Sequence, residues 1–199
     1  MKILFIGNSY TFFNKMPEEL FLPMARERWA DAEVRSVTRG GWYLYRFADP
    51  ENEEGIRLRR EIEGKHYDCV ILQDHSCNPV LDEEGFFESV GQLKELLSPV
   101  CDHFVLYSTW GRCDGSPKLE ELSLTREEMT ERLDAAYSRA GSAYGMEVAH
   151  VGKAFFAYGD AEAVRALYNP DLSHPSLEGS TLAARVILEA VARATEKNR

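Results

Sequence analysis

The stretch KILFIGNSYT, residues 2–11, determines how the rest of the chain is interpreted. Residues 2–6 form an almost unbroken apolar run, which is typical of a buried central strand in a parallel sheet. Gly7 and Asn8 end that run with turn-forming residues, and Ser9 follows at once. Open α/β sheets bind their ligands beyond the carboxyl ends of the strands, so this serine lies where a nucleophile is useful.

Two other interpretations fit the same residues. Ser9 can simply cap the helix that follows the turn. A glycine turn ahead of a helix can also bind an anion through its backbone N–H groups. Neither G-x-G-x-x-G nor G-x-x-x-x-G-K-[ST] occurs in this stretch, so nucleotide binding is poorly supported. The rest of the chain has to decide between these interpretations.

The composition is typical of one globular domain, which we expect to span residues 1–199. The net charge is −10, and no basic cluster is interleaved with aromatic residues, so we expect no nucleic-acid partner. No run approaches the ~20 apolar residues of a membrane span, so no membrane partner is expected. The first apolar run is too short for the core of a signal peptide, and we expect a cytoplasmic protein.

The cysteines and histidines do not indicate a metal site. Cys69, Cys77, Cys101 and Cys113 are scattered, without C-x-x-C or metal-ligand spacing. Two of them, Cys69 and Cys101, fall in or beside expected strands, where buried thiols are common. No metal and no other cofactor is therefore expected.

Apolar runs alternate with turn residues along the chain. Besides residues 2–6, strands are expected at 33–37, 69–73, 104–108 and 147–150. Helices are expected at 17–29, 49–64, 82–97 and 125–144, within 151–167, and after Ser176. Residues 109–123 are expected to form a loop long enough for a lid or pocket wall. This order predicts an α/β fold: a three-layer α/β/α domain around a flavodoxin-like parallel sheet of about five strands.

A second informative stretch is NPDLSHPS, residues 169–176, just before the last helix. A histidine general base needs a partner that fixes its tautomer and stabilises its charged form. Asp171, three residues before His174 on a turn, can reach Nδ1 of that ring and leave Nε2 for a serine from elsewhere. Taken singly, each residue is equally well explained as a turn aspartate or a surface histidine.

Four segments together resemble the blocks of the SGNH (GDSL-like) hydrolase superfamily. The segment GNSYT at 7–11 resembles the first block, with asparagine where many members have aspartate. The pair Gly40-Gly41 resembles the second block, LQDHS at 72–76 a variant third, and DLSHP at 171–175 the last. The blocks stand in family order and span nearly the whole chain. The resemblance is greatest to the subgroup with G-N-S-[FY]-T, L-Q-x-x-S and D-x-x-H-P-S.

This resemblance implies a catalytic triad. Ser9 is then the nucleophile, His174 the general base and later acid, and Asp171 the residue that orients the histidine. The oxyanion is held by the backbone N–H groups of Ser9 and Gly41, with Gly40 as a possible substitute for Gly41, and by a side-chain donor from the third block.

The sequence departs from the family in the third block, which usually carries an asparagine that donates to the oxyanion. By register His75 stands at that position, and an imidazole N–H can donate as an amide does. Gln73 remains an alternative, because it carries an amide at the end of the expected strand. Three aromatic residues in loops expected near the crevice are candidates for substrate binding, with ordinary packing as the alternative: Trp42, Trp110 and Tyr168.

The expected activity is hydrolysis of small acyl esters through an acyl-enzyme. Many members of the superfamily remove acetyl groups from carbohydrates, so an acetylated sugar is the narrower expectation. A lysophospholipase or thioesterase is an alternative enzyme, but no exposed apolar stripe demands a long acyl groove. A non-catalytic flavodoxin-like module that binds an anion at Ser9 is the alternative outside enzymes.

Overall fold

Five parallel strands form one sheet in the computed structural model, which describes residues 1–196. The strands are β1 (Lys2–Gly7), β2 (Glu33–Thr38), β3 (Tyr67–Leu72), β4 (Cys101–Ser108) and β5 (Glu147–His150). Their order across the sheet is β2-β1-β3-β4-β5, as in flavodoxin-like folds. The strand that leads to Ser9 is therefore an interior strand, as its apolar run predicts.

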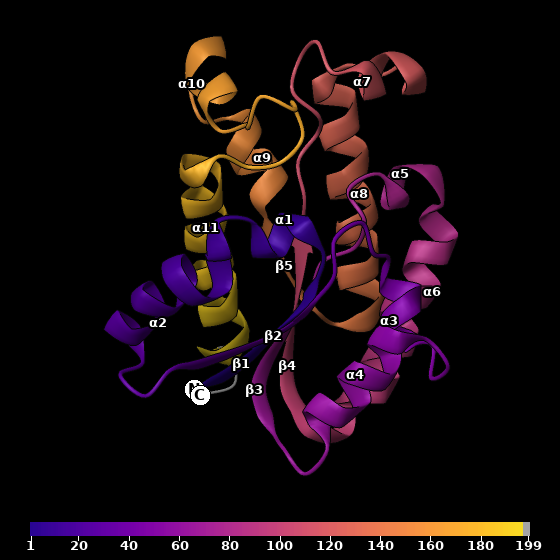
Figure 1. Ribbon diagram of the computed structural model, residues 1–199, viewed down its shortest axis with the longest axis vertical. Helices are drawn as coiled ribbons and strands as arrows, with labels where there is room; N and C mark the ends of the chain where they lie inside the picture. The colour runs from indigo at the N-terminus through magenta and orange to yellow at the C-terminus, as the bar shows by residue number, and fades with distance from the viewer. Residues whose placement is uncertain (197–199) are drawn as a thin grey trace.

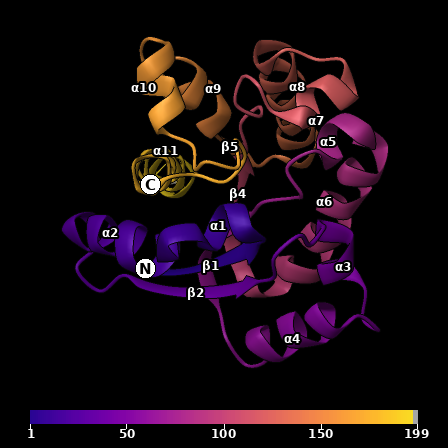
Figure 2. The ribbon, with the colours of Figure 1, turned by 45° about the horizontal axis from the view of Figure 1, so that its top comes forward.

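Helices cover both faces of this sheet (Figure 1). The segments up to the third strand are α1 (Ser9–Phe12), η1 (Phe13–Lys15), η2 (Met16–Phe21), α2 (Leu22–Arg28), α3 (Leu44–Ala48) and α4 (Glu53–Ile62). Those after it are α5 (Asn78–Leu81), α6 (Glu83–Leu97), η3 (Ser98–Val100), α7 (Pro117–Leu122), α8 (Arg126–Tyr144), α9 (Val151–Phe156), α10 (Ala161–Ala166) and α11 (Leu177–Glu196). Residues of η2, α2, α9 and α11 build the core on one face, and residues of α3, α4, α6 and α8 build the core on the other. Figure 2 shows α2 and α11 on the opposite side of the strands from α4. The predicted three-layer α/β/α architecture is confirmed.

Alternate residues of β1 supply the two cores. Ile3 and Phe5 point to the face covered by α2 and α11, whereas Leu4 and Ile6 point to the face covered by α4 and α6. All four side chains are fully buried. A strand buried on both faces has to be apolar throughout, which is why the sequence reads as a run rather than as an alternation.

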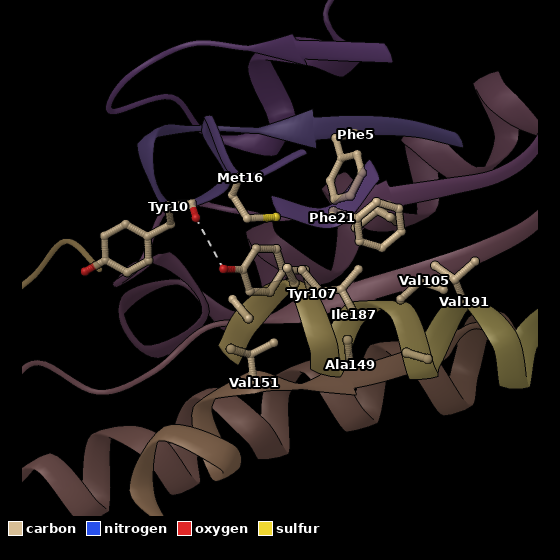
Figure 3. Packing of buried hydrophobic residues seen from close by; sticks show 14 of the residues in the cluster. Phe5, Tyr10, Met16, Phe21, Val105, Tyr107, Ala149, Val151, Ile187 and Val191 are labelled. Carbon is tan, nitrogen blue, oxygen red and sulfur yellow. Dashed lines mark hydrogen bonds between the residues drawn. The ribbon is translucent and has the colours of Figure 1, made fainter. Parts of the chain in front are cut away.

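The first of these cores reaches the residues next to Ser9 (Figure 3). Phe5 meets Phe21 of η2 edge-on, with ring centroids 5.1 Å apart. Tyr107 of β4 donates its hydroxyl to the backbone carbonyl of Tyr10 at 3.2 Å. Core packing therefore fixes the backbone immediately after the serine.

Two strands begin earlier than predicted. Strands predicted at 69–73 and 104–108 begin earlier, at Tyr67 and Cys101, which pair with each other in the ladder. The sequence hides these starts because Asp68 and Asp102 interrupt the apolar run while the backbone ladder continues. β3 also ends at Leu72, so residue 73 lies beyond the strand.

The predicted loop at 109–123 is only partly a loop, because α7 occupies its second half. Pro117 begins that helix, where its missing N–H is not needed. The sequence also gives no indication of α1, α3 and α5, since helices of four or five residues show no repeating apolar period. These three short helices follow the carboxyl ends of the first three strands.

The predicted buried thiols are confirmed. Cys69 and Cys101 are free and buried, as are Cys77 and Cys113. Across residues 1–196, none of the helices has the length and apolar character needed to cross a membrane.

Candidate active site

Three side chains from opposite ends of the chain meet at the carboxyl edge of the sheet. Ser9 opens α1 directly after β1, and its Oγ lies 2.9 Å from Nε2 of His174. The other ring nitrogen, Nδ1, lies 2.6 Å from Oδ2 of Asp171. The structure therefore brings together the three residues that the sequence singles out, in the order serine, histidine, aspartate.

The loop between α10 and α11 holds the aspartate and the histidine rigidly. Oδ1 of Asp171 accepts the backbone N–H groups of Ser173 at 3.0 Å and His174 at 2.9 Å, which leaves Oδ2 for the ring. Burial raises the pKa of Asp171, but the hydrogen bonds from His174 and Ser173 outweigh this effect and hold the pKa below its ordinary value. The carboxylate is thus kept ionised next to the imidazole.

Two aromatic rings restrict the imidazole. Phe13 stacks on His174 with centroids 4.4 Å apart, and Tyr10 meets its edge at 5.5 Å. Both rings belong to the segment that carries Ser9, so Ser9 and His174 are packed as one unit.

Gln73 is not placed to donate to an oxyanion, which corrects that prediction. Its carboxamide oxygen accepts the backbone N–H of Asn8 at 2.9 Å and the hydroxyl of Thr11 at 2.8 Å, and its nitrogen donates to the backbone carbonyl of Asp74. The side chain is buried because β1 lies next to β3 and Gly7 leaves room for it: a Cβ on Gly7 would lie 2.7 Å from the carboxamide oxygen. Gln73 therefore braces the serine's turn.

The two backbone donors that the sequence predicts are free. The N–H groups of Ser9 and Gly41 have no hydrogen-bond acceptor among residues 1–196. Gly41 has a φ of +68°, a conformation that side chains with a Cβ rarely adopt. Both residues line the same cleft, so they remain the proposed backbone part of an oxyanion hole.

His75 lines this cleft as well. Its ring stacks on Tyr43 with centroids 4.5 Å apart, and its Nδ1 accepts the backbone N–H of Cys77 at 3.4 Å, which assigns the ring proton to Nε2. Burial lowers the pKa of His75, and the positive charges of Arg112 and Lys118 lower it further. A neutral imidazole with Nε2–H is a hydrogen-bond donor, so His75 stays the candidate for the third donor.

The cleft is small, with a volume of about 180 Å³. Drug-sized ligands occupy pockets of about 300–1,000 Å³, so this one suits a short group. Its lining residues are Asn8, Ser9, Tyr10, Gly41, His75, Ser76, Arg112, Ser173 and His174.

Solved structures resemble this chain over almost its full length. A protein from Slackia heliotrinireducens described as a candidate SGNH hydrolase is 32% identical, with 96% of this chain and 98% of that chain covered and a TM-score of 0.83. The chain belongs to the SGNH hydrolases. A lipase/acylhydrolase from Enterococcus faecalis shares the fold at 17% identity, with 97% and 96% covered and a TM-score of 0.70. A DUF4886 family protein from Bacteroides uniformis does so at 17% identity, with 97% and 83% covered and a TM-score of 0.70. No family model and no curated protein matches the chain.

Two aromatic residues predicted to bind substrate are core residues in this SGNH hydrolase. Trp110 is fully buried between Tyr10 and Phe155, with centroids at 4.7 and 4.1 Å, and its Nε1 donates to the backbone carbonyl of Ser173. Tyr168 is also buried and donates its hydroxyl to a backbone carbonyl, that of residue 111. Both predictions are wrong because loop residues at this edge of the sheet can turn inward beneath a site as easily as into it.

Trp42 does not line the cleft either. The guanidinium groups of Arg39 and Arg46 lie over its ring at 4.2 and 4.3 Å. Its backbone carbonyl accepts the side-chain amide of Asn8 at 2.9 Å. Trp42 therefore supports the serine's turn through its main chain, and its ring is occupied by arginines.

Sequence reasoning missed five residues that line the cleft: Asn8, Tyr10, Ser76, Arg112 and Ser173. A signal for Arg112 exists, because it follows the carboxyl end of β4, the edge where the site is expected. Ser173 lies between the two predicted residues of the last block. For Tyr10 and Ser76, neighbours of other predicted residues, the sequence alone does not show which way the side chain turns.

Proposed function

We propose that this SGNH hydrolase is a serine esterase that cleaves short acyl esters through an acyl-enzyme. One observation carries the proposal: Oγ of Ser9, the ring of His174 and the carboxylate of Asp171 form a continuous hydrogen-bonded chain, with contacts of 2.9 and 2.6 Å. A hydroxyl activated by a base, with the base oriented by a third group, is the arrangement that nucleophilic catalysis requires.

Acylation follows from these contacts. Oγ of Ser9 bonds to the ester carbonyl carbon while its proton passes to Nε2 of His174. The negative charge then forms on the carbonyl oxygen, where the free N–H groups of Ser9 and Gly41 and the Nε2–H of His75 are proposed to stabilise it. Collapse breaks the bond to the alcohol oxygen, which leaves as the free alcohol with the proton from His174.

Deacylation repeats these steps with water as the nucleophile. The water oxygen bonds to the acyl carbon while His174 takes a proton from that water. The proton then passes to Oγ of Ser9 as the bond between Oγ and the acyl carbon breaks and the acid leaves. The ionised carboxylate of Asp171 stabilises the imidazolium in both halves. The net reaction is ester plus water to acid plus alcohol.

The size of the cleft supports a short acyl group. A volume of about 180 Å³ accommodates an acetyl group and part of the alcohol. The narrower proposal is an acetyl ester on a carbohydrate. Trp42, Trp110 and Tyr168 lie outside the cleft. The proposal of a carbohydrate substrate therefore rests on the family resemblance and on the small size of the cleft, and not on these three aromatic rings. A long-chain lysophospholipase or thioesterase would need a longer groove than this cleft offers.

The test has two parts. A fluorophosphonate probe should label wild-type protein and fail to label Ser9→Ala, because only an activated serine reacts with it. Hydrolysis of 4-nitrophenyl acetate should fall at least ~10³-fold in Ser9→Ala, with folding checked by circular dichroism. Full activity in the variant would reject the triad, and an absence of labelling in the wild type would favour a non-catalytic anion-binding module.

A further inference from the structure

Among the described residues that line the cleft, Arg112 is the one with a permanent charge, and none of them is a carboxylate. One guanidinium nitrogen, Nη1, donates to the hydroxyl of Tyr10 at 2.6 Å. The other, Nη2, donates to the hydroxyl of Ser76 at 2.8 Å. Among residues 1–196, no carboxylate oxygen lies within 4.0 Å of this guanidinium. The cation therefore stands beside Ser9 and His174 without a counter-ion.

This isolation contrasts with arginines elsewhere on the chain. On the surface, Arg39 and Arg139 each contact two glutamates. Arg112 is more enclosed than they are, and its Nε is buried with no acceptor in the described part of the chain. Removing a cation from water without a partner is costly. A ligand anion that enters the cleft would supply the missing partner.

The hydroxyl groups next to Arg112 also favour a ligand that accepts hydrogen bonds. A guanidinium only donates, so the hydroxyl of Tyr10 accepts from Arg112 and keeps its own proton for Oγ of Ser173, 2.9 Å away. Ser173 then has its hydroxyl proton available to a ligand. The positive charges of Arg112 and Lys118 also lower the pKa of His75, after the larger effect of burial. This side of the cleft is rich in hydrogen-bond donors and carries the positive charge of Arg112, although the chain as a whole carries a net charge of −10.

We propose that Arg112 binds a carboxylate carried by the ester substrate, so that this enzyme selects anionic esters over neutral ones. The inference rests on the proposed esterase function. Because ester and anion share a cleft of about 180 Å³, the carboxylate lies within a few bonds of the scissile carbonyl. It belongs either to the acyl group, as in a half-ester of a dicarboxylic acid, or to the alcohol, as in an acetylated acidic sugar or hydroxy acid.

Two matched substrate pairs distinguish these sources. For an anion on the alcohol side, 3-acetoxybenzoate is compared with 3-acetoxybenzamide. For an anion on the acyl side, monoethyl succinate is compared with ethyl succinamate in a pH-stat. The wild type should show a higher kcat/KM for the anionic member of at least one pair, and that pair identifies the side that carries the charge.

Variants of Arg112 test the residue itself. In Arg112→Gln the ratio of kcat/KM for anionic over neutral ester should fall about 10- to 100-fold, as expected for a lost hydrogen bond between charged groups. Arg112→Lys should retain part of the ratio, because it keeps the charge. The matched control is Arg139→Gln, which removes the same charge at the helix surface and should leave the ratio unchanged.

Binding to Ser9→Ala separates this proposal from the esterase proposal. Calorimetry should show tighter binding of 3-acetoxybenzoate or monoethyl succinate than of its neutral partner, even if no ester were turned over by the wild type. Equal affinity within both pairs would overturn the inference. So would an equal loss of kcat/KM for both members of each pair in Arg112→Gln, because Arg112 would then act on every ester alike. If that variant failed to fold, a wild type without preference in either pair would still reject the proposal.

Discussion

Two aspartate–histidine pairs of similar geometry lie on the carboxyl side of the sheet. Asp171 contacts Nδ1 of His174 at 2.6 Å, and Asp134 of α8 contacts Nδ1 of His150 at 2.5 Å. The second carboxylate is also held by Lys153 at 2.6 Å. Among residues 1–196 no hydroxyl lies on the other ring nitrogen of His150, whereas Ser9 lies on that of His174. An aspartate–histidine contact is therefore not by itself a sign of catalysis. The two pairs differ in the group that contacts the second ring nitrogen of the histidine.

Replacing each histidine should give the largest contrast. His174→Ala should lower kcat for 4-nitrophenyl acetate at least ~10⁴-fold, because the serine loses its base. His150→Ala should stay within about two-fold of wild type, since that ring contacts no reacting group. Steady-state kinetics on both variants, with matching circular dichroism spectra, checks this. Comparable losses of kcat in the two variants would contradict the proposed difference between His174 and His150.

Replacing each aspartate should separate catalysis from stability. Asp171→Asn should lower kcat about 10³- to 10⁴-fold, because the amide favours the wrong histidine tautomer. Asp134→Asn should leave kcat nearly unchanged and lower the free energy of unfolding by about 1–3 kcal/mol, since the negative charge is lost and one of the two oxygens that contact Lys153 and His150 becomes an amide donor. Kinetics and urea unfolding of both variants test this; near wild-type kcat in Asp171→Asn would mean that another group orients His174.

A third histidine, His75, sharpens the comparison because it has no carboxylate on its ring. As a neutral donor it should act on the oxyanion only, so His75→Ala should lower kcat about 10²- to 10³-fold with little change in KM. Gln73→Asn is the companion variant: its shorter amide should weaken the brace on the serine's turn and reduce the free energy of unfolding. Wild-type kcat in His75→Ala would leave the oxyanion hole to the N–H groups of Ser9 and Gly41.

Asp74 is a third carboxylate for comparison with Asp171 and Asp134: it is buried, and it contacts no histidine ring. Burial raises its pKa to about 6, although Asn78 and the backbone N–H groups of Leu44 and His75 donate to it. The folded protein therefore holds this proton at pH values where the unfolded chain has released it. The contribution of Asp74 to the free energy of unfolding is complete below pH 4 and falls by about 2–3 kcal/mol as the pH rises to 6.

The matched variant for this effect is Asp74→Asn, which cannot titrate. Urea unfolding at pH 4.5 and pH 7 should show that the stability difference between wild type and variant shifts toward the variant at the higher pH. A difference that does not change with pH would contradict the raised pKa. Of these predictions it has the smallest expected effect on activity, because Asp74 contacts no reacting group.

The sequence predicts the fold well, and it singles out the three residues of the proposed triad, for local reasons. Strand order follows from apolar runs that alternate with helices, and Asp171 and His174 lie on one turn, three residues apart. The position of Ser9 follows from the predicted end of the first strand. Each of these inferences needs only a few neighbouring residues and the general layout of a parallel sheet.

The inferences that fail depend on contacts between distant segments. The direction of Gln73 depends on the strand beside it and on the space above Gly7. Trp110 and Tyr168 turn inward because the core beneath the cleft has room for their rings. Arg112 is informative because no carboxylate surrounds it in the described part of the chain, which only a structure can show.

The brace formed by Gln73 also has a consequence for the motions of this protein. The amide hydrogen of Asn8, next to Ser9, is bonded to the buried side chain of Gln73, which directly follows the neighbouring strand β3. We expect this hydrogen to exchange with deuterium mainly when β1 and β3 move apart, an event that also exposes both cores. We therefore expect the turn beneath Ser9 to be as protected from exchange as the strands of the sheet, whereas many loops at the edge of a sheet open while the core stays closed.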